Sequence, residues 1–152
     1  MELILWRHAE AEAGEPDMGR ALTAKGRRQA AKMAAWLDNR LPESCRILVS
    51  PALRCVQTAE ALERKFKLQP ELAPDATPEQ LLAAAHWPDN REPVLLVGHQ
   101  PTLGRTAALL LSGQQQDWTI RKAGVWWIAQ NERDDEGGNF LRAVMSPELA
   151  AK

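Results

Sequence analysis

Three short apolar runs constrain the fold of this chain more than any other feature. They are residues 3–6 (LILW), 46–49 (RILV) and 93–97 (PVLLV), and each is followed by a polar or turn-forming residue. A run this short is too brief for a helix, and without polar alternation it is typical of a strand that is covered on both faces of its sheet. The chain is therefore expected to build a sheet that is parallel at its centre.

Helical patterns lie between these runs. Thr23 can cap a helix whose apolar residues recur at helical spacing over residues 30–37, and Ser50 with the proline after it predicts the start of a second helix. Thr77 opens a capping box for a short helix that ends near His86, and a longer helix follows the third apolar run and ends before a glycine. The second helix is expected to turn five residues inward: Leu53, Val56, Ala59, Leu62 and Phe66.

The end of the chain has a different pattern. Residues 125–129 and 140–145 read as two strands, and the polar segment QNERDDEGGN between them is typical of a hairpin turn. Strands that alternate with helices and end in a hairpin predict an α/β three-layer sandwich, with a mainly parallel central sheet, antiparallel strands toward an edge and helices on both faces. Residues 1–152 are expected to form a single domain.

Composition argues against several classes of protein. The formal net charge of −1 gives no global attraction to nucleic acid or to an anionic membrane. The first residues lack the pattern of a secretory signal, and no apolar run approaches the length of a membrane span. We therefore expect a cytoplasmic protein, and a monomer. Cys45 and Cys55 form neither a disulfide framework nor a zinc pattern, and we interpret both as small, buried or half-buried side chains.

Polar side chains gather where the three buried strands are expected to end. Arg7 and His8 follow the first run, Ser50 and Arg54 follow the second, and His99 follows the third. The carboxyl ends of parallel strands meet at one edge of a sheet, where ligands bind. Arg54 lies near the start of its helix, so its guanidinium and the free N–H groups of that helix favour the same anion. Two histidines with at least two arginines predict a site for one phosphoryl group.

Other interpretations apply to some of these residues. A histidine without a partner in the pattern, such as His86, is expected to be structural. A divalent metal bound by His8, His99 and a loop carboxylate is an alternative to the phosphoryl site, although the flanking arginines would repel the metal. Three carboxylates after the first strand most simply form a solvated loop: Glu10, Glu12 and Glu15.

Four segments resemble, in order and spacing, motifs of the histidine phosphatase superfamily, and most closely those of its small SixA-type phosphohistidine phosphatases. The segments are LWRHAEA, RALTAKGRRQA, SPALRCVQTA and VGHQPTL. The resemblance extends from Met1 to about Ser146 and departs from the family pattern at Ala9, where glycine is usual.

The resemblance implies a role for each matched residue. His8 would be the nucleophile that becomes phosphorylated, and Arg7 and Arg54 would bind the phosphoryl oxygens. Arg20 matches a further arginine near the phosphate, and His99 matches the second histidine of the pocket. No metal and no cofactor are implied.

The leaving group separates the branches of this family. Members that act on sugar or glycerate phosphates protonate a departing alkoxide with an acid, and the candidates here are Glu71, Asp75 and Glu79, of which Asp75 best matches the position of that acid. Imidazole is a much better leaving group than an alkoxide, so a phosphohistidine phosphatase can lack a strong acid. The resemblance implies phosphorelay transfer domains or phosphocarrier proteins as substrates. Two alternatives stay open: a phosphatase of small phosphate esters, and a phosphoprotein-binding module without activity.

Overall fold

The structure is a computed structural model that describes residues 1–130 and 138–150. One six-stranded sheet, in the order β3-β2-β4-β1-β5-β6, forms the middle layer. Its strands are β1 (Glu2–Arg7), β2 (Arg46–Val49), β3 (Lys67–Leu68), β4 (Val94–Gly98), β5 (Val125–Gln130) and β6 (Asn139–Met145). Four α-helices and two short 3₁₀ helices connect them: η1 (Asp17–Gly19), α1 (Ala24–Asp38), α2 (Leu53–Glu60), η2 (Pro70–Leu72), α3 (Pro78–Ala84) and α4 (Thr102–Ser112).

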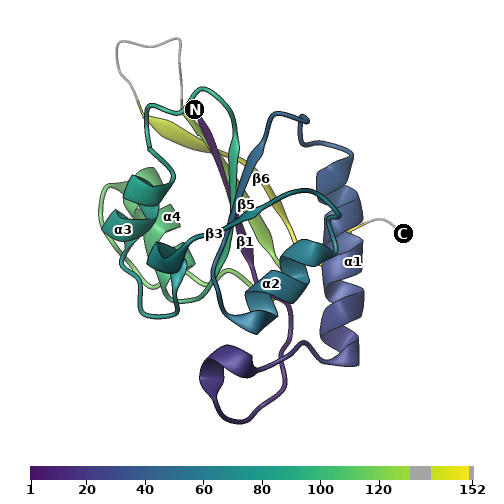
Figure 1. The fold of residues 1–152 in the computed structure, drawn as a ribbon. Coiled ribbons are helices and arrows are strands. Elements are labelled where there is room, and N and C mark those ends of the chain that lie inside the picture. The colour runs from purple at the N-terminus through teal and green to yellow at the C-terminus, as the bar shows by residue number, and fades with distance from the viewer. Residues whose placement is uncertain (131–137, 151–152) are drawn as a thin grey trace.

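Strand pairing confirms the predicted fold class. β1 pairs with β4 in parallel, β4 pairs with β2 and β2 with β3 in the same sense, whereas β5 and β6 add two antiparallel strands at the other edge. The helices α1 and α2 lie on one face of the sheet and α3 and α4 on the other (Figure 1). The β5–β6 pairing agrees with the predicted hairpin, although most of its turn, residues 131–137, lies outside the described residues.

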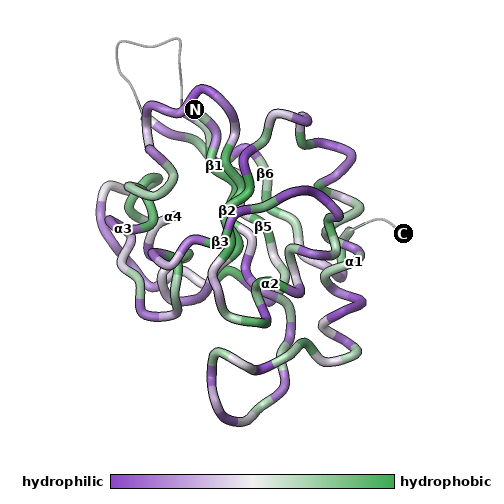
Figure 2. Tube along the Cα trace, in the orientation of Figure 1, coloured by the Kyte–Doolittle hydropathy of each residue, from purple (hydrophilic) through white to green (hydrophobic). Residues whose placement is uncertain are grey.

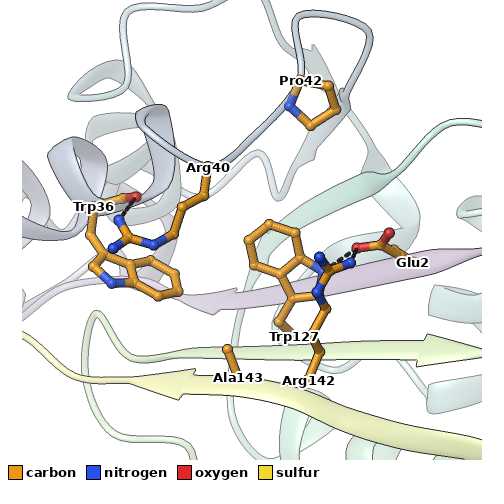
Figure 3. Close-up of a pocket in the computed structure, with 7 residues that line it drawn as sticks. All are labelled: Glu2, Trp36, Arg40, Pro42, Trp127, Arg142 and Ala143. Carbon is orange, nitrogen blue, oxygen red and sulfur yellow. Dashed lines mark hydrogen bonds and ion pairs between the residues drawn. The ribbon is translucent and has the colours of Figure 1, made fainter.

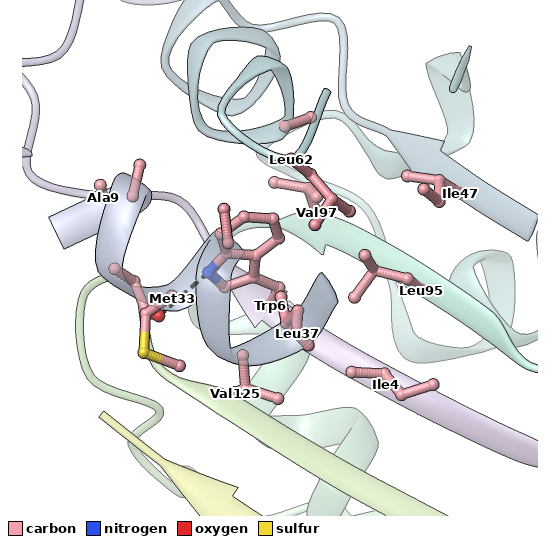
Figure 4. Packing of buried hydrophobic residues seen from close by; sticks show 14 of the residues in the cluster. Ile4, Trp6, Ala9, Met33, Leu37, Ile47, Leu62, Leu95, Val97 and Val125 are labelled. Carbon is pink, nitrogen blue, oxygen red and sulfur yellow. Dashed lines mark hydrogen bonds between the residues drawn. The ribbon is translucent and has the colours of Figure 1, made fainter. Parts of the chain in front are cut away.

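Two hydrophobic cores cover the two faces of the sheet. Successive side chains of β1 point to opposite faces, so Ile4 and Trp6 pack under α1 and α2 (Figure 4), while Leu3 and Leu5 pack under α3 and α4. The hydrophobic residues accordingly concentrate along the central strands, and polar residues prevail in the connecting loops (Figure 2). The indole N–H of Trp6 donates to the Ala123 carbonyl over 3.0 Å, which anchors the end of β1 just before the polar residues begin.

The start of the second helix differs from the prediction. The helix begins at Leu53 with Ala52 at the N-cap position, and the Ser50 side chain does not cap it. The Ser50 hydroxyl lies one step too early to cap the helix: it accepts from the N–H of Ala52, the N-cap residue, over 3.3 Å, and it is also hydrogen-bonded to His99 over 2.8 Å. The helix also ends at Glu60, so Leu62 and Phe66 pack against the core from the segment that follows it. Its buried residues include two polar ones that the apolar pattern missed, Arg54 and Thr58.

Close contact between α1 and the loop after β1 requires a glycine. A Cβ atom on Gly26 would collide with the backbone carbonyl of Glu10, which cannot move as freely as a side chain. We expect Gly26→Ala to lower the free energy of unfolding by about 1–3 kcal/mol, measured by urea denaturation. Gly19→Ala is the matched control, because its Cβ would meet only the Pro16 side chain at 3.4 Å. Equal stability of the two variants would contradict this account.

None of the helices in the described part of the chain is long and apolar enough to cross a membrane.

Candidate active site

The three parallel strand ends bring the polar residues to one place. The backbone N–H of His8 donates to the Gly98 carbonyl over 3.1 Å, and the N–H of Ser50 donates to the Val97 carbonyl over 3.0 Å. His8 and His99 therefore leave the sheet side by side, with ring centroids 5.3 Å apart and ring planes inclined by 57°. The edge predicted from the sequence thus holds both histidines within one site.

Hydrogen bonding and burial define the state of His8. Its Nδ1 lies 2.8 Å from the Ala9 carbonyl oxygen, which can only accept, so Nδ1 carries the hydrogen. Burial lowers the pKa of His8 to about 4; the Ala9 hydrogen bond opposes this shift, and the positive charges of nearby arginines add to it. At neutral pH the ring is therefore neutral, and Nε2 holds a free lone pair.

His99 is held in the opposite tautomer. Its Nδ1 lies 3.3 Å from a terminal nitrogen of Arg54, and a guanidinium can only donate, so Nδ1 accepts. The hydrogen then resides on Nε2, which donates to the Ser50 hydroxyl over 2.8 Å. Burial first, and then the proximity of His8 and Arg54, lower the pKa of His99 to about 3. Two uncharged imidazoles thus lie next to a buried cation.

Arg54 and Arg20 are linked through Asp17. The Arg54 side chain, on a residue only 3% exposed, donates to the Asp17 main-chain carbonyl over 2.8 Å and to its carboxylate over 3.1 Å. Arg20 donates to the other oxygen of the same carboxylate over 3.1 Å and is also bonded to the Glu12 carbonyl. The hydrogen bond from Arg54 is the main reason that the pKa of Asp17 is lowered. Both arginines are therefore held in place by Asp17, the first residue of η1.

Two buried guanidinium N–H groups in the site have no acceptor among the residues that the structure describes. Arg7 donates through Nη1 to the Ile120 carbonyl over 2.9 Å. Within the described residues, the Nε of Arg7 and the Nε of Arg54 are the buried side-chain polar atoms that lack a hydrogen-bond partner. Buried donors are rarely left unpaired, because each lost hydrogen bond costs about 1–3 kcal/mol. Both arginines lie near enough to His8 to lower its pKa, and an oxyanion bound beside either Nε would supply the missing acceptor.

Sequence reasoning missed several residues that support the site. Asp17 was not singled out, although it stands three residues before Arg20, a spacing that allows an ion pair. Cys55 is buried, as expected, but its Sγ also lies 3.5 Å from His99 Nε2. The Thr58 hydroxyl accepts from the N–H of Ala9 over 3.0 Å and so fixes the chain directly after His8.

The remaining sequence candidates have different surroundings. Asp75 is exposed, and its carboxylate makes no hydrogen bond or ion pair within the described parts of the chain. Its neighbour Ala76 accepts a hydrogen bond from Thr102 over 2.7 Å, which brings this segment to the first turn of α4, close in sequence to His99. His86 is exposed after α3 and has a positive φ of 55°.

The loop carboxylates and the second cysteine also have defined places. Glu10 accepts a hydrogen bond from the Thr23 hydroxyl over 2.9 Å, and Thr23 in turn caps α1, so this glutamate is structural. Glu12 and Glu15 are exposed, as expected. Cys45 is half-buried, in agreement with its interpretation as a packing residue.

The protonation of both histidines is open to direct measurement. Because their pKa values are lowered to about 4 and about 3, both rings should remain neutral from roughly pH 8 down to roughly pH 5. The unfolded chain binds protons on these rings below about pH 6.5 while the folded chain does not, so the free energy of unfolding should decrease as the pH falls below that value. Imidazole chemical shifts and denaturation curves across this range test both statements. A midpoint near pH 6.5 for either ring in the folded protein would contradict them.

A hollow near the amino end of β1 is distinct from this site. It has a volume of about 510 Å³ and is lined by Glu2, Trp36, Arg40, Pro42, Trp127, Arg142 and Ala143 (Figure 3). Its charged groups are already engaged: Glu2 accepts from the Trp127 indole over 2.6 Å and pairs with Arg142 over 2.9 Å, and Arg40 donates to the Trp36 carbonyl. The contacts of these residues explain their positions without a ligand.

Comparisons with known proteins agree with this geometry. The sequence model of the histidine phosphatase superfamily (branch 1) matches residues 3–77. The phosphohistidine phosphatase SixA of Escherichia coli K12 is 30% identical over 156 aligned positions, which cover 97% of this chain and 94% of that protein. A solved structure of the protein histidine phosphatase SixA complexed with tungstate superposes with a TM-score of 0.80 at 26% identity, covering 97% of each chain.

More distant structures share the fold alone. A phosphoserine phosphatase of Entamoeba histolytica has a TM-score of 0.70 at 17% identity, and the match covers 95% of this chain and 96% of that one. The order of the strands, the two histidines and the arginines at the strand ends, and the full-length similarity to SixA all point the same way. The chain belongs to the histidine phosphatase superfamily.

Proposed function

We propose that this protein is a phosphatase that removes the phosphoryl group from phosphohistidine on a protein substrate, through a covalent intermediate at His8. The observation that carries the proposal is the state of His8, a buried neutral ring whose Nδ1 is hydrogen-bonded and whose Nε2 is left unprotonated. A neutral imidazole with a free lone pair is the form that can attack phosphorus. Similarity to SixA over nearly the whole chain supports the choice of substrate.

In the first step, Nε2 of His8 attacks the phosphorus and the bond from phosphorus to the substrate imidazole breaks. Negative charge spreads over the three equatorial oxygens, and the guanidiniums of Arg7, Arg54 and Arg20 would stabilise it; the effect of all three on the pKa of His8 supports this role. His99 accepts a hydrogen bond from Arg54 and would lie against the same phosphoryl group. The other ring nitrogen of the substrate takes up a proton from solvent before the bond to phosphorus breaks, so the group that leaves is neutral imidazole.

In the second step, water attacks the phosphorus of phosphorylated His8, and the bond to Nε2 breaks. The products are inorganic phosphate and free enzyme with a neutral His8, so one displacement is divided into two. The positive charge that both steps require is supplied by arginines of this chain, which supports a reaction independent of metal ions. The structure of SixA with tungstate, a tetrahedral oxyanion, is consistent with such a cradle.

Phosphorelay transfer domains and phosphocarrier proteins are the substrates that we propose. The segment between β3 and β4 contains only η2 and the seven-residue helix α3, which leaves little chain to enclose a small ester. A single domain of residues 1–152, the monomeric state and the cytoplasmic location stay predictions.

Substrate preference tests the proposal directly. We expect kcat/KM for a phosphohistidine protein to exceed that for sugar and nucleotide monophosphates by more than about 100-fold, or about 2.7 kcal/mol at the transition state. A preference of similar size for an ester would favour the alternative of a small-ester phosphatase. Binding without turnover on either class of substrate would favour a module without activity.

Asp75→Asn distinguishes the two enzymatic alternatives. Because imidazole leaves without strong acid catalysis, the variant should hydrolyse phosphohistidine within about threefold of the wild-type rate, whereas a true general acid contributes about 100-fold or more. Rates are compared on a phosphohistidine protein and on a sugar phosphate. The control is Asp89→Asn, which changes an exposed aspartate beyond α3. A loss of 100-fold or so in the Asp75 variant alone, on phosphohistidine, would show that the reaction needs this carboxyl group.

A further inference from the structure

Two adjoining hollows lie between α1 and the segments 119–122 and 147–148, and one of them reaches Arg7 of the active site. One has a volume of about 620 Å³ and includes Arg7, and the other has a volume of about 350 Å³ and lies against α1. Both are lined by Lys25, Gln29 and Glu148, so the two form one continuous depression. We call it the basic groove, and its lining residues are Arg7, Glu10, Lys25, Arg28, Gln29, Lys32, Thr119, Arg121, Lys122, Pro147 and Glu148.

The charge of this groove differs in sign from that of the whole chain. Six of its lining residues are lysine or arginine and two are glutamate, an excess of four positive charges, whereas the chain has a formal net charge of −1. Such a local field attracts anionic partners and raises their rate of association.

Three of these cations have no counter-charge in the described part of the chain. Lys25, Arg28 and Lys32 are exposed, recur on one side of α1, and form no ion pair within residues 1–130 and 138–150. The two glutamates of the groove lie beside other cations: Glu10 is 4.0 Å from Lys122, and Glu148 is 3.8 Å from Arg121. The stripe of three on α1 is therefore available to negative groups of another molecule.

The groove is continuous with the active site through Arg7, which lines the one and belongs to the other. His8 is only 9% exposed, so a phosphohistidine that reaches its Nε2 must project from a surface lying close against this protein. On the α1 side, that surface would cover the basic groove. Carboxylates placed around the projecting phosphohistidine would then meet Lys25, Arg28 and Lys32.

We propose that the basic groove is the docking surface for the acidic face of the phosphohistidine-bearing protein substrate. This inference rests on the proposed function and adds the partner's chemistry to it: a protein with aspartate and glutamate side chains beside its phosphohistidine. Binding through these exposed charges acts on association and on KM, while the phosphoryl-transfer step stays with the residues of the active site.

A triple variant tests the groove, with Lys25, Arg28 and Lys32 each changed to glutamine. Glutamine keeps a helix-favouring side chain and removes only the charge. The control changes three exposed cations outside the groove, Lys65, Lys67 and Arg91, to glutamine, which gives the same loss of net charge. The substrates are a phosphorylated phosphorelay transfer domain, a phosphorylated phosphocarrier protein and phosphoramidate, a small compound with a phosphorus–nitrogen bond.

For at least one protein substrate, the triple variant should raise KM by about tenfold or more at low salt, with kcat within about twofold of wild type. Hydrolysis of phosphoramidate should be unaffected, and the control should resemble the wild type on every substrate. Added salt should raise KM for the protein substrate more in the wild type than in the triple variant, because salt screens charges beyond about 10 Å.

Two failures are distinguishable. If the wild type hydrolyses a phosphohistidine protein but the triple variant and the control have equal KM values, the docking surface is wrong and the proposed function stands. If the wild type hydrolyses none of the phosphohistidine substrates, the proposed function is wrong, and the inference falls with it.

Discussion

His8→Ala is expected to reduce kcat on a phosphohistidine protein by at least about 10⁴-fold, because loss of a nucleophile commonly costs that much or more. In the wild type, labelled phosphate should be trapped on the protein after an acid quench, and the variant should trap none. His86→Ala is the matched control, since it removes an exposed histidine that is not one of the site residues. An active His8→Ala enzyme would contradict the mechanism.

A second substitution separates chemistry from folding. The Nδ1 of His8 donates to the Ala9 carbonyl, so alanine removes a buried hydrogen bond as well as a nucleophile. His8→Asn offers an amide N–H to the same carbonyl without a nucleophilic nitrogen. We expect this variant to keep a melting temperature close to that of the wild type and to be as inactive as His8→Ala. Activity in the asparagine variant would show that His8 acts only through its structural hydrogen bond.

Arg54→Lys is expected to lower kcat/KM by about 10²–10³-fold, or about 2.7–4 kcal/mol, although it preserves the charge. Arg54 uses its fork on three partners, the Asp17 carbonyl, the Asp17 carboxylate and His99 Nδ1, and its Nε remains for an oxyanion. A lysine ammonium cannot reach these positions together. The measurement is steady-state kinetics on a phosphohistidine protein, with the melting temperature recorded in parallel.

Arg64→Lys serves as the control for loss of a multiply bonded arginine. Arg64 also binds several acceptors, including the Asp38 carboxylate over 2.9 Å and the Pro42 carbonyl over 2.9 Å, but none belongs to the active site. Its replacement should affect stability and leave kcat unchanged. Arg54→Gln gives a second test of this residue. The positive charge of Arg54 lowers the pKa values of His8 and His99, so the variant should have higher pKa values for both. A kcat/KM within tenfold of wild type for Arg54→Lys would contradict the role proposed for the guanidinium group of Arg54.

Much of the architecture could be predicted because it depends on local patterns. The apolar runs that became β1, β2 and β4 have no competing helical or alternating pattern, and the rule that parallel strands present their carboxyl ends together placed His8, Ser50 and His99 at one edge. The antiparallel edge could be predicted for the same reason, since two short strands flank one polar segment.

The predictions fail where contacts between residues distant in sequence determine the local structure. Ser50 has the sequence context of a helix cap, yet its hydroxyl reaches only the N-cap residue Ala52 and also bonds to His99, 49 residues away. Asp17 contacts Arg54 across 37 residues, and that contact depends on the path of the chain between β1 and α1, where η1 is too short to produce a periodic pattern. The strand β3 contains two exposed residues at the edge of the sheet, too few to produce a hydrophobic signal. Sequence patterns predict helices and strands well, but the hydrogen-bond partner of each polar side chain depends on the tertiary fold.

The two hydrogen bonds from Arg54 to Asp17 affect the entropy of substrate binding. A free arginine side chain loses roughly 2 kcal/mol of rotamer entropy when it is fixed. Here both terminal nitrogens of Arg54 are already bonded to Asp17 before any phosphoryl group arrives. That ordering cost is incurred when the chain folds, so an incoming phosphoryl group meets a guanidinium that is oriented in advance.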